Sequence, residues 1–157
     1  MILREFDPVG DDAARLRAFT CSTGTLFEDE VQIWIRSASA AWFNDVPRSA
    51  FQRRVLALIE DDAGSLVAVA AWQDIIRVDL DGIWLEVLAV ATEHQHSGNG
   101  NRAYGLVVDR LRADGRGGES VAGLVHPDNG RSKRLLTAVG WEQIDHLDDH
   151  ELWLGRI

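Results

Sequence analysis

The chain has 157 residues, 46% of them hydrophobic, and a formal net charge of -9 at pH 7. This length fits a single compact domain over 1–157, and the negative charge argues against broad nucleic-acid binding. The only cysteine, Cys21, excludes a disulfide framework and a thiolate zinc site, and no apolar run approaches the roughly twenty residues of a membrane span. Without a signal-peptide pattern at its N-terminus, the chain is expected to be cytoplasmic.

The first half of the chain predicts a strand, two helices and a β-hairpin. A short strand is expected at 2–6 and a helix at 11–19, after the turn DPVG. Apolar residues at helical spacing predict a second helix at 27–43. The two strands at 54–60 and 65–79 flank DDAG, a turn signal, and are therefore predicted to pair antiparallel.

The second half predicts a βαβ unit followed by a helix and two strands. IWLEVLAV at 83–90 is apolar except for Glu86, which is typical of a central strand buried on both faces. A helical stripe predicts a helix at 101–113, and 119–126 is the next strand. A further helix runs from PDN to Gly140, and the tail supplies two more strands.

The predicted fold class is therefore α/β, a mixed sheet of six to seven strands with helices on its faces, in the order β-α-α-β-β-β-α-β-α-β-β. Because a helix connects strands 83–90 and 119–126, these two are expected to be parallel neighbours.

The segment HQHSGNGN, residues 94–101, joins the central strand to the helix at 101–113. It fits G-x-G-x-x-A poorly as a dinucleotide fingerprint, because 93 residues precede it and the next strand ends in His126 and not in an acid. His94 and His96 at i, i+2 spacing lack an evident third metal ligand. Two interpretations remain: backbone N–H groups that bind phosphate at a helix N-terminus, or an ordinary turn that needs glycine.

Two motifs carry a resemblance to the GCN5-related N-acetyltransferase (GNAT) family. Residues 95–100, QHSGNG, resemble the family's Q/R-x-x-G-x-G/A signature. The segment VHPDNGRSKRLLTAVGW resembles its fifth strand and following helix, with Asn129 at the usual asparagine and Trp141 replacing the usual phenylalanine. The match extends from about residue 54 to 141, whereas only the element order fits before residue 50.

The resemblance implies that strands four and five splay apart and that acetyl-CoA binds in the gap as the co-substrate, with no metal. The residues expected to bind the cofactor are Leu88, Ala89, Val90, Gln95, His96, Ser97, Gly98, Asn99, Gly100, Asn101 and Asn129. The backbone near Leu88 to Val90, where the family's strand bulges, would polarise the thioester carbonyl.

Acetyl transfer to an amine also needs a base and an acid for the thiol leaving group. Glu86 is the candidate general base, with a structural or acceptor-binding role as the alternative. The family's tyrosine acid is replaced by Leu136, so Ser132 or His126 would act, or the thiolate would leave unassisted, or the protein would be slow or inactive. Tyr104, the only tyrosine, lies on a core stripe and is expected to be packing.

The acceptor is expected against residues 20–45, where aromatic and acidic side chains suit a cationic amine. These side chains are Trp34, Trp42, Phe43, Glu28, Asp29 and Glu30, although the helical spacing of Trp34 and Trp42 favours the core over a pocket wall. The predicted function is N-acetylation of a primary amine of a small molecule, peptide or protein, with a homodimer left open. One alternative is a non-catalytic acyl-CoA-binding module. The other is a toxin that acetylates aminoacyl-tRNA: FTCS at 19–22 resembles the F-x-C-G motif of such enzymes, but the net charge of the chain argues against this function.

Overall fold

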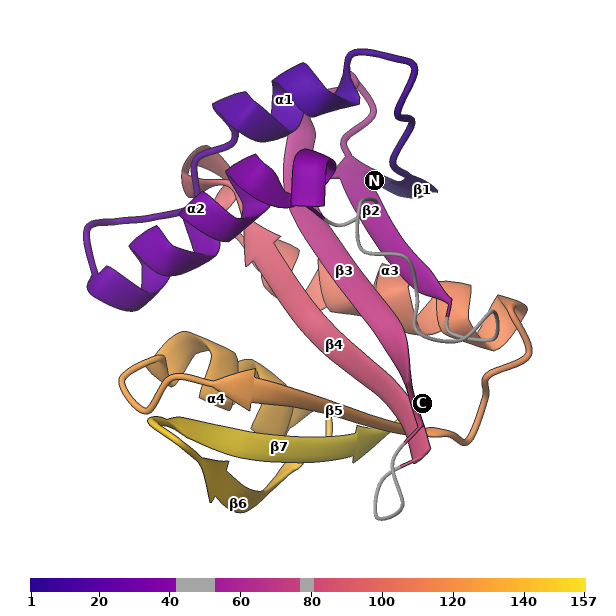
Figure 1. Cartoon of the computed structure of the whole chain (residues 1–157), viewed down its shortest axis with the longest axis vertical. Helices are drawn as coiled ribbons and strands as arrows, with labels where there is room; N and C mark the ends of the chain where they lie inside the picture. Colours follow the sequence, from indigo (N-terminus) through magenta and orange to yellow (C-terminus); the bar gives the residue numbers. More distant parts are fainter. Residues whose placement is uncertain (42–52, 77–80) are drawn as a thin grey trace.

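A computed structural model describes residues 1–41, 53–76 and 81–157 (Figure 1). In its first half the chain forms β1 (Ile2–Glu5), α1 (Asp12–Ala18), α2 (Leu26–Ala41), β2 (Arg54–Glu60), β3 (Leu66–Ile76) and β4 (Asp81–Val90). It continues with η1 (Thr92–His94), α3 (Asn99–Ala113), β5 (Ser120–Val125), α4 (Gly130–Ala138), β6 (Glu142–Leu147) and β7 (His150–Arg156). The predicted order of strands and helices is confirmed.

The strands form one seven-stranded sheet in the order β1-β2-β3-β4-β5-β7-β6. All neighbours pair antiparallel except β4 and β5, which are parallel, as the βαβ prediction requires. The predicted mixed sheet is therefore confirmed. The parts of the predicted helix and strand at 42–43 and 77–79 lie outside the described residues.

Two hydrophobic cores cover the two faces of the sheet. Leu16 and Phe19, from α1 and the turn after it, and Ile35 of α2 pack on one face. Tyr104 and Val107 of α3 pack on the other with α4 residues. Figure 1 shows α3 and α4 behind the sheet and α2 in front of β3 and β4. Within the described ranges, no helix is long and apolar enough to cross a membrane.

An ion-pair network fastens β1 and α1 to the hairpin. Arg4 donates to both carboxylate oxygens of Asp12, at 2.5 and 2.6 Å, and to Glu60 on β2. Arg15 also pairs with Glu60. Asp12 is buried, and the backbone N–H of Asp7 donates to it as well, so its charge is well compensated. This network holds the N-terminal helices against the sheet.

Candidate active site

A cleft of about 310 Å³ opens between β4 and β5. Its walls come from β4, residues 95–100, β5, the first turns of α4 and the start of α2. The two strands pair only at Ile83 with Val121 and Trp84 with Ala122, and Figure 1 shows them diverging beyond that point. The splay that the resemblance implied is therefore present.

Small residues and one indole shape the narrow end of the cleft. Gly123 lies where the strands part, and a Cβ there would come within 3.0 Å of the Leu85 carbonyl oxygen. The Trp141 ring lies against Gly155 so closely that a Cβ on that glycine would be 2.3 Å from the indole. Trp141 thus fills the space beside the strands, which explains why an aromatic residue suits this position after Gly140.

A β-bulge places Glu86 at the cleft. Ala71 of β3 lies opposite Val87 and Trp72 opposite Leu85, so Glu86 is the extra, unpaired residue of β4. The expected bulge near Leu88 to Val90 is wrong in position, because the register from Val87 to Val90 is regular. A bulge next to a site redirects a side chain, and Glu86 is one of the residues that line the cleft.

The free edge of β4 offers backbone polar groups to the cleft. Ala91 N–H donates to Val67 on β3 at 2.8 Å, so alternation along the strand directs the amides of Val90 and Leu88 to the opposite edge. That edge has no β5 partner beyond Trp84. Of the three predicted backbone contacts, Leu88 and Val90 therefore face the gap, whereas the amide of Ala89 pairs with β3.

The Glu86 side chain is exposed where it enters the cleft, yet partial desolvation by the surrounding walls raises its pKa. A hydrogen bond from Trp84 and the charge of Arg54 act in the opposite direction but do not cancel this effect. The expectation that β4 is buried on both faces is wrong at this end, where Glu86 is exposed and Leu88 and Val90 are only half-buried because the cleft opens along them. A carboxylate with a raised pKa suits proton transfer near neutral pH.

The side chains of the loop at 94–101 hold its backbone in shape. Ser97 Oγ donates to the carbonyl oxygens of His94 and Gln95, and Asn99 Nδ2 donates to His94 at 2.9 Å. Gln95 Nε2 binds the carbonyl oxygens of Cys21, at 2.8 Å, and Val90, at 3.1 Å. The loop is therefore tied to both the 20–25 segment and the end of β4.

Two residues of this loop are left-handed, Gly98 with φ 76° and His96 with φ 64°. Gly100 does not need a positive φ, because it lies in the first turn of α3. Its small size matters instead: a Cβ there would be 3.2 Å from Leu135 Cδ1. Gly98 is the residue that turns the chain into the helix, since a left-handed conformation costs other residues more.

No acceptor in the described part of the chain takes a hydrogen bond from the backbone N–H groups of residues 96–101. These groups lie at the positive end of the α3 dipole, and residues 95–100 supply a wall of the cleft. Consecutive free N–H groups of this kind bind anions such as phosphate. Of the predicted cofactor residues, Ser97 and Asn101 lie outside the cleft lining, whereas the others line it.

The loop contains two histidines, His94 and His96. Among the described residues, no cluster of three or more His, Cys, Asp or Glu could hold a metal ion. His94 Nε2 lies 3.5 Å from Glu93, and His96 is exposed.

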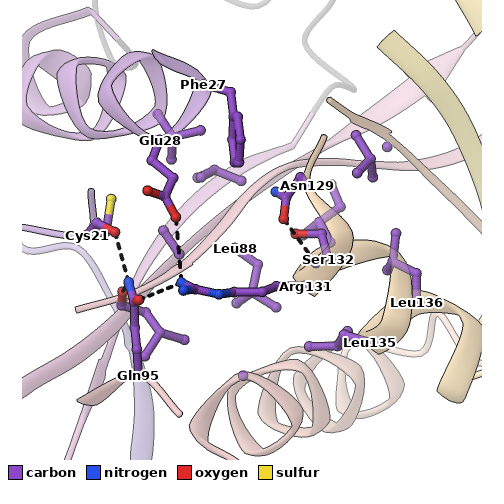
Figure 2. A pocket seen from close by; sticks show the side chains of 18 of the residues that line it. Cys21, Phe27, Glu28, Leu88, Gln95, Asn129, Arg131, Ser132, Leu135 and Leu136 are labelled. Carbon is purple, nitrogen blue, oxygen red and sulfur yellow. Dashed lines mark hydrogen bonds and ion pairs between the residues drawn. The ribbon is translucent and has the colours of Figure 1, made fainter. Parts of the chain in front are cut away.

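The first turns of α4 form the wall opposite β4. Asn129 caps the helix by accepting a hydrogen bond from Ser132 N–H at 3.1 Å (Figure 2). Ser132 and Leu136, one helical turn apart, both line the cleft. Leu136 is buried and brings no hydroxyl group, so Ser132 is the only hydroxyl that α4 contributes to the described lining.

By sequence, no family model matches the chain, and neither does any curated protein. Solved structures match over nearly its whole length. The PaiA N-acetyltransferase of Thermoplasma acidophilum, in complex with coenzyme A, is 16% identical, with a TM-score of 0.69 over 99% of this chain and 98% of that one. A putative GNAT acetyltransferase of Desulfovibrio desulfuricans is 19% identical, with 0.64 over 98% and 97%. The chain has the GNAT fold. Mycobacterium smegmatis RimJ, in complex with CoA-disulfide, is 17% identical, with 0.64 over 98% and 80%.

In this GNAT fold, the start of α2 covers the wide end of the cleft. Phe27 and Glu28 line it, and the Phe27 ring stacks on His126 with centroids 4.9 Å apart. His126 Nδ1 accepts a hydrogen bond from Asp128 N–H, which leaves the proton of the neutral ring on Nε2. Trp34 packs on the hydrophobic core formed with α1 and α2, as its helical spacing favoured, and not in the cleft lining. Trp42 and Phe43 lie outside the described residues.

The remaining predicted acceptor groups differ in how they are held. Asp29 accepts a hydrogen bond from Ser22 Oγ at 2.6 Å, and Glu30 is exposed. Cys21 also lines the cleft, but burial, helped by the charge of Glu28, raises the pKa of its thiol to about 11. Cys21 therefore stays protonated at neutral pH and is unsuited to act as a nucleophile.

Arg131 is a site residue that the sequence analysis missed. It lies in the first turn of α4 and reaches Gln95 Oε1 at 2.8 Å across the cleft. A positive side chain in the first turn of a helix interacts unfavourably with the helix dipole. This unfavourable position in the sequence could have indicated that Arg131 has a role other than stabilising α4.

Proposed function

We propose that this chain is an acetyl-CoA-dependent N-acetyltransferase that acts on a primary amine. The observation that carries the proposal is the run of unpaired N–H groups at 96–101, opening on a cleft between parted strands. Such a run fits a diphosphate, and the gap beside the free edge of β4 fits a slender amide-bearing arm. The solved structures of the same fold that contain coenzyme A support this assignment.

Acetyl-CoA would supply an acyl group activated as a thioester. The N–H groups of 96–101 would hold its phosphates, and the outward amides of Leu88 and Val90 would bond its arm and polarise the carbonyl. Asn129 and Leu135 would form the opposite wall. No side chain of the described lining other than Arg131 carries a permanent positive charge, so the backbone is the main source of anion binding.

The reaction needs a neutral amine, and Glu86 would accept its proton, directly or through one water. As the C–N bond forms and the C–S bond breaks, the sulfur takes a proton. Ser132 is the nearest hydroxyl on the wall where Leu136 stands, and His126 Nε2 is the second donor that the structure offers. We assign Ser132 this role as a relay, in which its hydroxyl passes a proton to the sulfur while taking one from a water molecule, because Ser132 lines the cleft and His126 does not.

A non-catalytic acyl-CoA-binding module is the second candidate, and Leu136 favours it, because the cleft then lacks the hydroxyl of a tyrosine. We further propose that 1–157 forms one domain and acts in the cytoplasm. No feature of the cleft favours an aminoacyl-tRNA substrate over other amines.

One pair of measurements tests the proposal. Calorimetry should give a micromolar Kd for acetyl-CoA, and a panel of amines with mass-spectrometric detection should reveal a product 42 Da heavier than its substrate, about the mass of an added acetyl group less one hydrogen. Binding without a product would favour the non-catalytic module. Absence of binding at millimolar acetyl-CoA would reject both candidates.

A further inference from the structure

Arg131 bridges the two halves of the splayed sheet. Its guanidinium extends from α4, on the β5 side, to two residues on the β4 side. Nη1 donates to Gln95 Oε1 at 2.8 Å and lies 3.6 Å from Glu28 Oε1 on α2. Figure 2 shows the side chain stretched across the cleft between α4 and these partners. The bridge therefore ends at Gln95, directly beside the proposed phosphate loop.

The bridge places a positive charge beside the proposed phosphate loop. Gln95, which accepts the hydrogen bond, immediately precedes the unpaired N–H groups of 96–101. The Arg131 side chain is 49% exposed, so it has room to change partners. A guanidinium binds a phosphate group through two parallel hydrogen bonds and is only loosely held by a carboxylate at 3.6 Å.

Glu28 does not depend on Arg131 for its charge. The backbone N–H and the hydroxyl of Thr23 donate to Glu28 Oε2 at 2.8 and 2.7 Å. Burial acts to raise the pKa of Glu28, but hydrogen bonds from Thr23 and Thr25 outweigh it and hold the pKa below its usual value. The carboxylate would thus stay ionised after Arg131 left, and Glu28 lines the cleft.

We infer that Glu28 and the cofactor's phosphates compete for Arg131. In the free chain, Glu28 and Gln95 hold the guanidinium across the cleft; on cofactor binding it moves to a phosphate group and leaves the Glu28 carboxylate free to bind a cationic amine. This inference rests on the proposed function and adds a binding role for Glu28.

The competition predicts an unusual gain from removing a charge. Glu28→Gln should tighten coenzyme A binding about two- to fivefold, the range expected for losing a solvent-screened ion pair that opposes binding. Arg131→Met should weaken binding roughly tenfold, because a charge-assisted bond to phosphate is lost. In the Arg131→Met background, Glu28→Gln should change the affinity no further, since the residue competed for is gone.

Calorimetry with two ligands isolates the phosphate dependence. Coenzyme A carries the phosphates, whereas pantetheine has the same arm without them, so all variants should bind pantetheine equally. Asp29→Asn is the matched control: it removes the same charge one residue further along α2, where the carboxylate bonds Ser22 and not Arg131. Arg131→Lys, which keeps the charge, should retain most of the affinity, and thermal melts should show each variant folded.

The outcomes separate this inference from the function on which it rests. If the wild-type chain binds no coenzyme A, the proposed function fails. If it binds, but Glu28→Gln behaves like Asp29→Asn, weakens binding, or acts equally in the Arg131→Met background, the function stands and the competition is rejected. An equal gain for pantetheine would also reject it, because the phosphates would then play no part.

Discussion

Trp141 Nε1 donates a 2.7 Å hydrogen bond to the hydroxyl of Tyr104 inside the α3 core. The two rings meet edge to face, with centroids 6.2 Å apart. Burial raises the pKa of Tyr104, although the bond from Trp141 acts to lower it. The only tyrosine of the chain is therefore committed to packing, as its place on a core stripe predicted, and it cannot serve as the acid for a thiolate in the cleft.

Because Tyr104 cannot supply the proton, a tyrosine introduced at Leu136, which lines the cleft, tests whether a hydroxyl there speeds the reaction. If the missing hydroxyl limits turnover, Leu136→Tyr should raise kcat about tenfold, a modest share of what general acid catalysis supplies. Leu136→Phe adds the ring without the hydroxyl and should give no gain. Steady-state kinetics with the acceptor found in the amine panel decides between them. Equal rates for the two variants would show that protonation of the leaving group is not limiting.

Glu86→Gln should lower kcat about a hundredfold or more and leave coenzyme A affinity unchanged, because a base contributes to the reaction and not to cofactor binding. Since the base must be ionised, wild-type kcat/KM should fall as the pH drops through the raised pKa of Glu86, above the roughly 4.3 of a free glutamate. The variant should lose this acid limb. Glu93→Gln, at an exposed position outside the cleft lining, is the control. If kcat/KM of Glu86→Gln still fell at low pH as in the wild type, a group other than Glu86 would be the base that accepts the amine proton.

Gly98→Val should weaken coenzyme A binding more than tenfold, because valine resists the left-handed conformation that shapes the N–H groups of the loop. Gly64→Val is the matched control. Gly64 has a similar φ, 82°, in the turn between β2 and β3, and no atom lies within 4 Å of a Cβ at either glycine. Both variants should lose comparable thermal stability, but only Gly98→Val should lose affinity. If Gly98→Val and Gly64→Val bound coenzyme A with similar affinity, the loop at 94–101 would be an ordinary turn without a role in phosphate binding.

Asp12→Asn should destabilise the chain by roughly 2 kcal/mol, less than for a fully buried pair because Arg4 is partly exposed. Hydrogen bonds from Arg4, opposed by burial, hold the pKa of Asp12 below its usual value. Its contribution is therefore complete above the unfolded pKa of about 3.9 and is lost as the pH falls below that value.

Urea unfolding between pH 7 and pH 3 measures this effect. The variant should lose less stability than the wild type across the acid range, although Glu60, whose pKa the Arg4 hydrogen bond also lowers, still contributes. An unchanged slope with pH would contradict the role assigned to Asp12.

The sequence by itself determined the element order and the position of the glycine-containing loop at 94–101. Local signals were sufficient there: alternating apolar residues, turn pairs and the capping residue Asn129 act within a few positions of the chain. The same holds for Gly98, whose left-handed conformation at the start of α3 follows from the chemistry of glycine.

Only the tertiary structure decided how far the strands pair and which groups meet across the gap. IWLEVLAV has the composition of a strand buried on both faces, but β5 leaves it after Trp84, and the bulge falls at Glu86 rather than near Leu88. The bridge from Arg131 to Gln95 and Glu28 joins residues far apart in the sequence. Such contacts depend on where three separate elements pack, and the pattern of residues within one element carries no record of that arrangement.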